Sequence, residues 1–396
     1  METSTFEQFK QSIDDIAGIQ TAQNMVPVKK SILLSFVSDS SGCGHVRNIF
    51  PMTYLNSVYG KNSDIIPIIS PMFIWQQDIL VRTKSIFFQR QMSPDQLKAI
   101  HQYKELQKSY KFKMVWDIDD FIWGANEQQG GTIDDGVPTY NFGWRGIVPE
   151  VKAASIEIMK LMDLITVSTE YLKWYLTTVK GITVPIKVVP NAIPKYFWGN
   201  KRKKPITKDI VRPRVVYTGS PTHYNNQEKL EGDFKNAWKD WVIKAVNENR
   251  IEFYCMGGLP FFFESIKDKI KIVDWVNSFQ YHHTVKDINA DFGIMPLVPN
   301  NFNYSKSDIK AIELYSCGVA CIGTTFTNGK PSPYDNNPLK LPDNCSVKDI
   351  DNMIAKYSKV DEYNKILNIQ YNKMIKEHRY LEAPEYVKML VESYFI

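Results

Sequence analysis

Three carboxylates stand close together in the stretch Met114–Trp123, which reads MVWDIDDFIW. Asp117, Asp119 and Asp120 come at the end of an apolar run that is typical of a strand entering a core. Such a group can hold a divalent metal ion, act as a general base toward a hydroxyl group, or cap the turn after the strand. Alternation along the strand is expected to place Asp117 and Asp119 on one face and Asp120 on the other.

A second group of polar residues occupies positions 38–50, which read SDSSGCGHVRNIF. Gly42 and Gly44 allow a tight turn after a strand, and a helix that begins near His45 would point its amide groups at an anion. The third glycine of a G-x-G-x-x-G fingerprint is missing, because Arg47 or its neighbour stands in its place. The segment predicts a phosphate or sugar contact, and an ordinary strand-to-helix turn is the alternative.

The stretch 303–323, NYSKSDIKAIELYSCGVACIG, carries a stripe of charged residues at helical spacing. Lys306, Lys310 and Glu313 fall at i, i+4 and i+7, and the helix is expected to begin at Ser305, with Lys306 in its first turn. This arrangement suits a nucleoside diphosphate that lies along the helix, with the cation on the phosphates and the carboxylate on the ribose. A solvated Lys–Glu face is the alternative.

The segment GSPTH at positions 219–223 follows another expected strand. Gly219 and Ser220 allow a ligand to approach the backbone closely. His223 is placed to reach into a cleft between domains, although a structural histidine is equally consistent with the sequence.

The elements that must position these residues alternate along the chain. Short runs rich in β-branched residues alternate with helical periodicity, which predicts parallel sheets covered by helices. Ser93, Pro94 and Gln96 supply an N-cap, a proline at the first helical position and a capping-box partner. The expected strands are 31–37, 64–70, 85–90, 113–117, 164–168, 187–190, 214–220, 250–258, 271–276, 290–297 and 319–323.

A basic segment divides the chain. Residues 200–214 read NKRKKPITKDIVRPR, with four consecutive basic residues and two prolines, which is typical of an exposed linker. We therefore expect an N-terminal domain at 1–198, a linker at 199–213, a second α/β domain at 214–370 and a helical tail at 371–396. A chain of 396 residues is long enough for two hydrophobic cores.

Composition limits the class of protein. Apolar residues make up 43% and charged residues 23%, which are ordinary proportions for a folded protein, and the net charge of +5 permits an anionic partner without requiring one. No apolar run approaches the ~20 residues that span a bilayer, so we expect no membrane insertion and a cytoplasmic location. The five cysteines show no zinc spacing and are expected to be reduced.

Taken together, these motifs resemble GT-B fold glycosyltransferases that work with retention, particularly phage-type members. The matching motifs are GxGxxR (Gly42, Gly44, Arg47), D-x-D-D (Asp117, Asp119, Asp120), T-E-Y-L (Thr169 to Leu172), P-N (Pro190, Asn191), G-S-x-T-H (Gly219 to His223) and K-S-x-x-K-x-x-E (Lys306, Ser307, Lys310, Glu313). The resemblance implies two Rossmann-like domains whose parallel sheets face a central cleft. The first would hold mainly the acceptor, and the second mainly a nucleotide-sugar donor.

The resemblance also implies roles for residues. Donor contacts are expected from Gly42, Gly44, Arg47, Gly219, Ser220, His223, Lys306, Lys310 and Glu313. Catalytic roles are expected for Asp119, Asp120 and His45, and acceptor contacts for Asp117, Trp123 and Arg145. The family pattern has two glutamates eight positions apart, and Ser305 replaces the first of them. Glu313 matches the second, the ribose ligand.

Cations beside the expected donor site bear on the question of a metal. Lys306 and Arg47 can neutralise a leaving diphosphate, so we expect no metal and no cofactor beyond a nucleotide-diphosphate sugar, with a UDP-sugar as the first candidate. A metal held by the aspartates and a purely structural cap remain the alternatives.

The acceptor suggested by the phage-type motifs is 5-hydroxymethylcytosine in double-stranded DNA, as in T-even-type phages. KRKK at 201–204, Lys111, Lys113 and Arg145, with rings such as Trp116 and Trp123, could supply a cationic groove with stacking surfaces. A monomer, in the host cytoplasm if phage-encoded, is expected. The alternatives are a polysaccharide, lipid-linked or protein acceptor, and a non-catalytic nucleotide- or DNA-binding GT-B module, which Ser305 favours.

Overall fold

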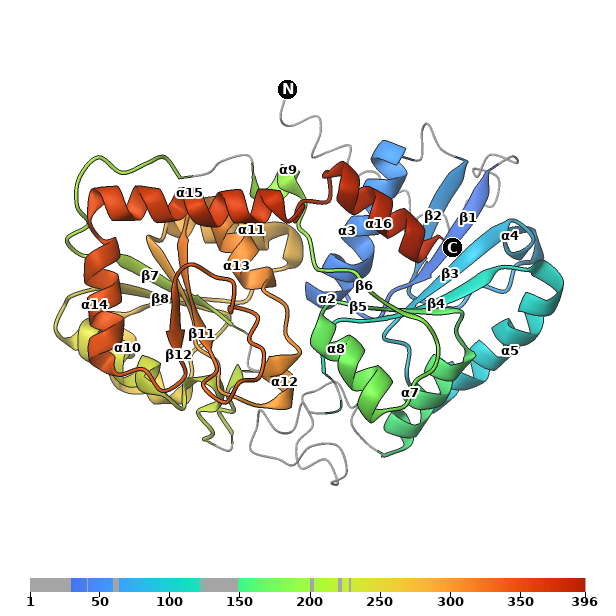
Figure 1. Ribbon diagram of the computed structural model, residues 1–396, viewed down its shortest axis with the longest axis horizontal. Coiled ribbons are helices and arrows are strands. Elements are labelled where there is room, and N and C mark those ends of the chain that lie inside the picture. The colour runs from blue at the N-terminus through green and yellow to red at the C-terminus, as the bar shows by residue number, and fades with distance from the viewer. Residues whose placement is uncertain are drawn as a thin grey trace. The chain divides into compact units, whose positions relative to one another are not determined.

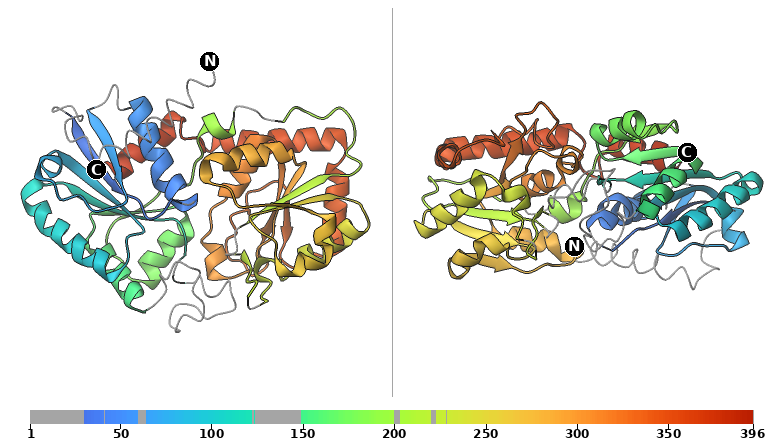
Figure 2. Two further views of the ribbon diagram at one scale, coloured as in Figure 1. Left: turned by 180° about the vertical axis from the view of Figure 1, so that it is seen from behind. Right: turned by 90° about the horizontal axis from the view of Figure 1, so that it is seen from below.

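The computed structural model describes residues 30–40, 42–59, 64–121, 123, 149–199, 203–219, 223–227 and 229–395. The chain divides into two compact units, shown with their helices and strands in Figures 1 and 2. Unit 1 comprises Met1–Asp119, Val148–Asn191 and Leu381–Ile396, and unit 2 comprises Asp120–Ile147 and Ala192–Tyr380.

Unit 1 contains a six-stranded parallel sheet in the order β2-β1-β3-β4-β5-β6. Strand β1 places Leu34 beside Ile68 of β2 and Ile86 of β3. All three side chains are buried, as expected for strands covered on both faces. The strands are β1 (Ser31–Phe36), β2 (Ile65–Ser70), β3 (Thr83–Gln89), β4 (Lys113–Ile118), β5 (Leu164–Val167) and β6 (Ile186–Val188).

The longest helix of unit 1 confirms its predicted start. The side chain of Ser93 accepts the backbone N–H of Gln96, and the Gln96 side chain accepts the backbone N–H of Ser93. This capping box opens α5, and the C-cap residue Lys111 takes the left-handed conformation. The helices are α2 (Gly42–Gly44), α3 (Phe50–Tyr54), α4 (Gln77–Leu80), α5 (Pro94–Tyr110), α7 (Pro149–Leu161), α8 (Glu170–Trp174) and α16 (Pro384–Tyr394), with π-helical turns at His45–Ile49, Leu55–Tyr59 and Tyr175–Val179.

Helix α16, drawn in red in Figure 1, belongs to unit 1 although it is the last element of the chain. The ring of Tyr394 lies 4.2 Å from that of Phe87 between centroids, and the Tyr394 carbonyl accepts the hydroxyl of Ser85 at 2.8 Å. The hydroxyl of Tyr386 donates to the carbonyl of Pro190 at 2.7 Å. The expected tail of residues 371–396 is therefore divided between the units, because its end covers β3.

Unit 2 contains a second six-stranded parallel sheet, in the order β12-β11-β10-β7-β8-β9. The strands are β7 (Arg214–Thr218), β8 (Glu252–Met256), β9 (Lys271–Val273), β10 (Phe292–Met295), β11 (Ala320–Thr325) and β12 (Lys340–Pro342). Among the described strands, β12 is the one that the sequence pattern did not indicate. The two parallel sheets confirm the expected fold class.

The helices of unit 2 complete its α/β architecture (Figure 2). They are α9 (Lys195–Trp198), α10 (Ala237–Asn247), α11 (Ser278–Ile288), α12 (Asn301–Tyr304), α13 (Ile309–Cys317), α14 (Val347–Tyr357) and α15 (Val360–Lys376), with 3-10 helices at Gly232–Phe234 and Phe261–Lys269. Helix α13 packs against both α11 and α15. Trp238 and Trp241 of α10 are fully buried in the core of this unit.

The expected linker lies against unit 2 where the structure describes it. The ammonium of Lys203 pairs with the carboxylate of Asp291 at 2.5 Å, and Ile206 and Ile210 pack on the core of the unit. Lys203, Ile206 and Ile210 therefore hold this segment against unit 2, whereas other side chains of the segment, such as Val211, are exposed. Across the described part of the chain, no helix is both long and apolar enough to cross a membrane.

Candidate functional site

The sheet of unit 2 changes direction between β7 and β10, since β8 and β9 extend it on one side and β11 and β12 on the other. In open parallel sheets, ligands bind outside the carboxyl ends of the strands at such a switch point. β7 ends at Thr218 and leads to Gly219 and His223, whereas β10 ends at Met295 and leads to α13. The residues predicted to contact a donor in this unit therefore follow the two strands that flank the switch point.

A chain of hydrogen bonds joins three charged or titratable residues here. The carboxylate of Asp233, which has no solvent exposure (0%), accepts the Nδ1–H of His223 at 2.5 Å and the side-chain N–H of Asn303 at 2.6 Å. Because the carboxylate is the acceptor, the proton of the neutral imidazole lies on Nδ1. Its Nε2 is then an acceptor, and it faces the Nζ of Lys310 at 2.9 Å.

The environment disfavours positive charge on both of these bases. Burial, followed by the charges of Lys310 and Lys306, lowers the pKa of His223 to about 3, against the opposing effect of Asp233. Burial and the charge of Lys306 lower the pKa of Lys310 to about 7. His223 is therefore neutral at physiological pH, and Lys310 titrates close to neutrality.

Helix α13 begins later than predicted. Its N-cap is Asp308, whose carbonyl accepts the N–H groups of Ala311 and Ile312 and whose carboxylate pairs with Arg379 at 2.6 Å. The expectation of a start at Ser305 is wrong, because the short helix α12 ends just before that residue. Lys310, rather than Lys306, thus lies in the first turn of α13.

Lys306 precedes the helix, and its ammonium lies 4.3 Å from the centroid of the Phe302 ring. Its neighbour Ser305 is fully buried, and the Ser305 hydroxyl donates to the Phe302 carbonyl at 2.7 Å. Ser305, which stands at the position of the family's first glutamate, therefore hydrogen-bonds to the local backbone. Lys306 is half-buried and close enough to Lys310 and His223 to depress the pKa of both.

Glu313 lies one turn beyond Lys310 on α13 and is buried. Its carboxyl group is hydrogen-bonded to the hydroxyl of Tyr281 on α11. Burial raises the pKa of Glu313 to about 8, although Lys310 and Tyr281 act in the opposite direction. At neutral pH the group is therefore mainly a protonated acid that can donate as well as accept a hydrogen bond.

Gly219 allows a close approach at the end of β7. A Cβ atom at this position would lie 2.0 Å from the hydroxyl oxygen of Tyr217, so only glycine fits without a shift of that ring. The ring of Tyr217 in turn lies 5.9 Å from the ammonium of Lys310. Ser220, the next predicted donor contact, is outside the described residues.

The sheet of unit 1 has its own switch point, between β1 and β3, and the glycine turn follows β1. A Cβ atom on Gly44 would lie 1.8 Å from the carbonyl oxygen of Asp39, whereas one on Gly42 would have no neighbour within 4 Å. The side-chain amide of Gln89, at the end of β3, donates to the carbonyl of Cys43 at 2.8 Å. The turn is thus tightly folded at Gly44 and open at Gly42.

The sequence predicts that Arg47 contacts the donor and that Asp117 contacts the acceptor. In the structure these two residues contact each other instead. The guanidinium Nη2 and Nε of Arg47 donate to the two carboxylate oxygens of Asp117 at 2.5 and 3.1 Å, and Nη1 donates to the Val189 carbonyl and the Asn191 side chain. The exposed fractions are 1% for Arg47 and 0% for Asp117. Arg47 as a donor cation and Asp117 as an acceptor contact are therefore corrected to a buried ion pair, which joins the π-helical turn at His45–Ile49 to β4.

His45 is buried at the start of the π-helical turn, where its ring lies 5.2 Å from that of Phe50. Arg90, a residue that the sequence analysis did not single out, follows β3 with a positive φ of 49°. Its guanidinium lies 3.9 Å from carboxylate oxygens of both Asp39 and Asp119. A fixed cation is therefore present beside the glycine turn, but it is Arg90.

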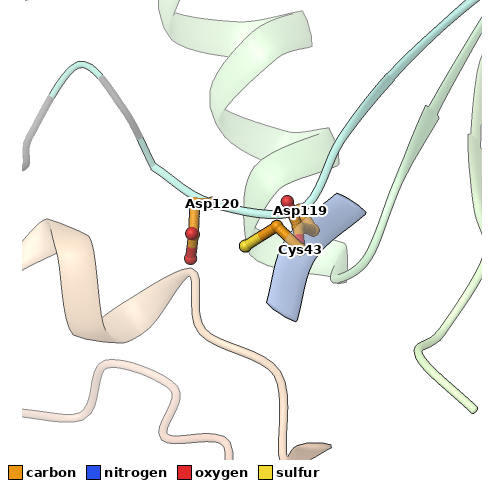
Figure 3. A group of neighbouring side chains, drawn as sticks. All are labelled: Cys43, Asp119 and Asp120. Atoms are coloured by element: carbon orange, nitrogen blue, oxygen red, sulfur yellow. The ribbon is translucent and has the colours of Figure 1, made fainter. Parts of the chain in front are cut away.

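Figure 3 shows Asp119 and Asp120 grouped with Cys43 where the chain leaves β4. One oxygen of each carboxylate and the Cys43 sulfur lie within 4.8 Å of one another. A thiol and two carboxylates make a mixed donor set, whereas magnesium and calcium prefer oxygen ligands alone. The predicted metal-free role of the aspartates stays a prediction.

The stacking surface expected for a flipped base is not found where the structure describes it. Trp123 is 1% exposed and packs edge-on to Phe121, and Trp116 is buried with its indole N–H donated to the Gln91 carbonyl. Lys111 precedes β4 and Lys113 is its first residue, so both lie at the edge of the sheet opposite to the carboxyl ends. Arg145 and positions 201–202 are outside the described residues.

Several residues at the two switch points were missed by the sequence analysis. They are Asp233, Tyr281 and Asn303 in unit 2, and Gln89 and Arg90 in unit 1. The polar pair that ends the expected strand 85–90 was the available signal for Gln89 and Arg90. No local pattern marks Asp233, since it comes ten positions after His223 in a short 3-10 helix.

The chain was compared with protein families, curated proteins and solved structures. No protein-family model matches the chain, and no curated protein matches it either. Among solved structures, it is similar to sucrose-phosphate synthase from Thermosynechococcus elongatus, with 10% identity, a TM-score of 0.57, and coverage of 92% of this chain and 98% of that one. A glycosyltransferase from Rickettsia africae gives 14% identity and a TM-score of 0.56 at the same coverage of both chains.

Anabaena HepE in complex with UDP-glucose is a third similar structure, with 9% identity, a TM-score of 0.55, and coverage of 91% of this chain and 98% of that one. In each case nearly the whole chain takes part in the match. The likeness therefore extends over both six-stranded parallel sheets. The chain has the GT-B fold.

Proposed function

We propose that this chain is a glycosyltransferase that moves a sugar from a nucleoside diphosphate donor to a hydroxyl group, with retention at the anomeric carbon. The observation that carries the proposal is the position of Lys306, Lys310 and Glu313 after β10, at the switch point of unit 2. It is supported by the whole-length likeness to HepE, which was solved with UDP-glucose and makes a UDP-sugar the first donor to test.

The proposed chemistry needs positive charge where the leaving group forms. The bond between the anomeric carbon and the diphosphate oxygen breaks, and negative charge develops on the diphosphate. Lys306 and Lys310 supply cationic nitrogens, and α13 begins between them, with the end of its dipole that favours an anion. The acceptor oxygen bonds to the anomeric carbon and loses its proton, for which Asp119 or Asp120 is the proposed base.

The acceptor that we propose is the hydroxymethyl group of 5-hydroxymethylcytosine in double-stranded DNA. The phage-type motifs and the net charge of +5 support it, whereas the buried rings of Trp116 and Trp123 give it no support. Saccharide, lipid-linked and protein acceptors are therefore outcomes of the same test. We further propose that the protein is a monomer and acts in the cytoplasm, which is that of the host if the protein is phage-encoded.

The test is mass spectrometry of nucleosides from hydroxymethylcytosine-containing DNA after incubation with the protein and a panel of nucleotide sugars. Each reaction is run with and without a chelator. A mass increment on the modified cytosine establishes the catalysis, acceptor and sugar class together. Its persistence in chelator supports the metal-free role of the aspartates.

Two variants make the result specific to the site. Lys306→Ala is expected to lower turnover at least tenfold, which corresponds to ~1.4 kcal/mol of transition-state stabilisation. Lys359→Ala is the matched control, because Lys359 is exposed at the start of α15 and paired with Asp209 on the surface. Normal turnover in Lys306→Ala would refute the proposed donor site.

A second candidate is a nucleotide-binding module without catalysis, and the burial of Ser305 at the position of the family's first glutamate favours it. Slow hydrolysis of a nucleotide sugar in the absence of acceptor distinguishes the two. Hydrolysis that Lys306→Ala abolishes supports the enzyme, even if DNA is not modified. Binding of UDP with no hydrolysis and no transfer supports the module.

A further inference from the structure

Lys310 makes an unusual contact for a lysine that is proposed to bind an anion. Its Nζ lies 2.9 Å from Nε2 of His223, whose Nδ1–H is donated to the buried carboxylate of Asp233 at 2.5 Å. The amine therefore meets a neutral acceptor, and the carboxylate lies one imidazole ring away. Asp233 is itself fixed by the side chain of Asn303 and the N–H of Val298.

This arrangement orients the Lys310 side chain without fixing its amine as an ammonium. A carboxylate in direct contact would hold the lysine as a permanent ammonium. The imidazole instead accepts one N–H from the amine, and the uncharged amine keeps a lone pair on the nitrogen. The electrostatic attraction of Asp233 reaches the nitrogen only at a distance.

Charged groups face Lys310 from several elements of unit 2. Lys306, in the segment before α13, disfavours the ammonium, whereas Asp233, Glu313 and Asp120 favour it. Burial opposes the charge more strongly than any of these neighbours, and the ring of Tyr217 lies 5.9 Å from Nζ. A ligand that brings negative charge into this environment shifts the balance toward the ammonium.

Building on the function proposed above, we propose that Asp233 and His223 are positioning residues for Lys310, and that binding of a nucleoside diphosphate is coupled to uptake of one proton at Lys310 Nζ. The proton comes from solvent and binds to the lone pair of the amine. The resulting ammonium donates one N–H to His223 Nε2 and others to a phosphate oxygen. On release of the nucleotide the proton returns to solvent.

The test is isothermal titration calorimetry of UDP into the protein at pH 8, in HEPES and in Tris. These buffers differ in their ionisation enthalpy, so the difference in observed heat gives the number of protons taken up. With a Lys310 pKa of about 7, the free amine is ~90% uncharged at pH 8 and the expected uptake is about 0.9 proton. The affinity for UDP should fall up to about tenfold per pH unit above pH 7.

Glu313 requires its own control, because its carboxyl group can release a proton when Lys310 gains one. Its pKa is raised to about 8, and Lys310 acts to lower it. The titrations are therefore repeated in Glu313→Gln, where the uptake at Lys310 is isolated. Lys359→Met serves as the matched control for an exposed lysine in a surface ion pair, and it should leave the uptake unchanged.

Two variants report on the positioning residues. Lys310→Met should abolish the proton uptake while leaving weaker binding of UDP. Asp233→Asn removes the distant negative charge, which lowers the pKa of Lys310 in the free protein. At pH 7 the wild-type protein should take up about half a proton, and Asp233→Asn should take up more. A merely structural role of Asp233 would weaken binding without this change in proton number.

The outcomes separate the inference from the function on which it rests. UDP binding with no buffer-dependent heat in both the wild type and Glu313→Gln overturns the proton coupling and leaves the donor site intact. Uptake that survives Lys310→Met assigns the proton elsewhere and also overturns it. Failure of UDP, ADP and GDP to bind at all refutes the proposed function, and the inference with it.

Discussion

The buried pair of Arg47 and Asp117 allows a quantitative test of whether it is a structural ion pair or part of the donor site. Arg47→Met leaves the carboxylate of Asp117 with one side-chain hydrogen bond among the described residues, which it accepts from the Thr166 hydroxyl at 2.7 Å. Loss of one partner from a buried ion pair costs about 3–5 kcal/mol of folding free energy. That is a large share of the ~5–15 kcal/mol by which folded proteins are stable.

The double-mutant cycle of Arg47→Met and Asp117→Asn sharpens this prediction. Arg47→Met should cost more than Asp117→Asn, because Arg47 also donates to Val189 and Asn191. The destabilisation of the double variant should be smaller than the sum of the two single effects by about 2–3 kcal/mol. Each single variant leaves one buried charge without its partner, whereas the double variant removes both charges. The measurement is urea unfolding followed by tryptophan fluorescence.

The competing explanation makes the opposite prediction. If Arg47 were the cation for a donor diphosphate, its removal would cost less than about 1 kcal/mol of stability, as at surface ion pairs, and would weaken UDP binding at least tenfold. A structural ion pair predicts large destabilisation and, at a temperature where the variant stays folded, a Kd for UDP within about twofold of the wild type. Destabilisation below about 1 kcal/mol in both single variants would refute the structural reading.

Two further predictions concern the glycine turn and Glu313. Gly44→Ala should lower the free energy of unfolding in urea by about 1–3 kcal/mol, because its Cβ would lie 1.8 Å from the Asp39 carbonyl oxygen. Gly42→Ala is the matched control, since a Cβ there meets no atom within 4 Å. Equal stability of the two variants would contradict this geometry. The raised pKa of Glu313, about 8 against an ordinary value of 4.5, means that the folded state binds this proton more tightly than the unfolded state. Wild-type stability should therefore fall relative to Glu313→Gln as pH rises from about 5 to 8, and parallel stability curves would exclude the shift.

Local sequence patterns predicted much of the fold. The Ser93–Gln96 capping box and the apolar strand runs depend on residues close together in the chain, and both appear in the structure as expected. β12 was not indicated because it is only three residues long and ends in Pro342. The start of α13 was misplaced because Ser305 and Asp308 are both good N-cap residue types.

The site was predicted less completely, because its contacts join distant parts of the chain. Lys306, Lys310 and Glu313 were found because they share one segment. Asp117 and Arg47 are 70 positions apart, and nothing local indicates that each satisfies the other. Both side chains are buried, and the ion pair joins β4 to the turn at His45–Ile49 across this separation.

The route of the chain has a practical consequence for dissecting the protein. Residues 381–396 return to unit 1 and cover Phe87, so that most of unit 2 is an insertion within the sequence of unit 1. A fragment that stopped at Asn191 would expose the apolar surface of β3 to water and invite aggregation. An isolated first unit therefore calls for a rearranged gene, in which the codons for 381–396 are joined by a short flexible linker after those for Asn191.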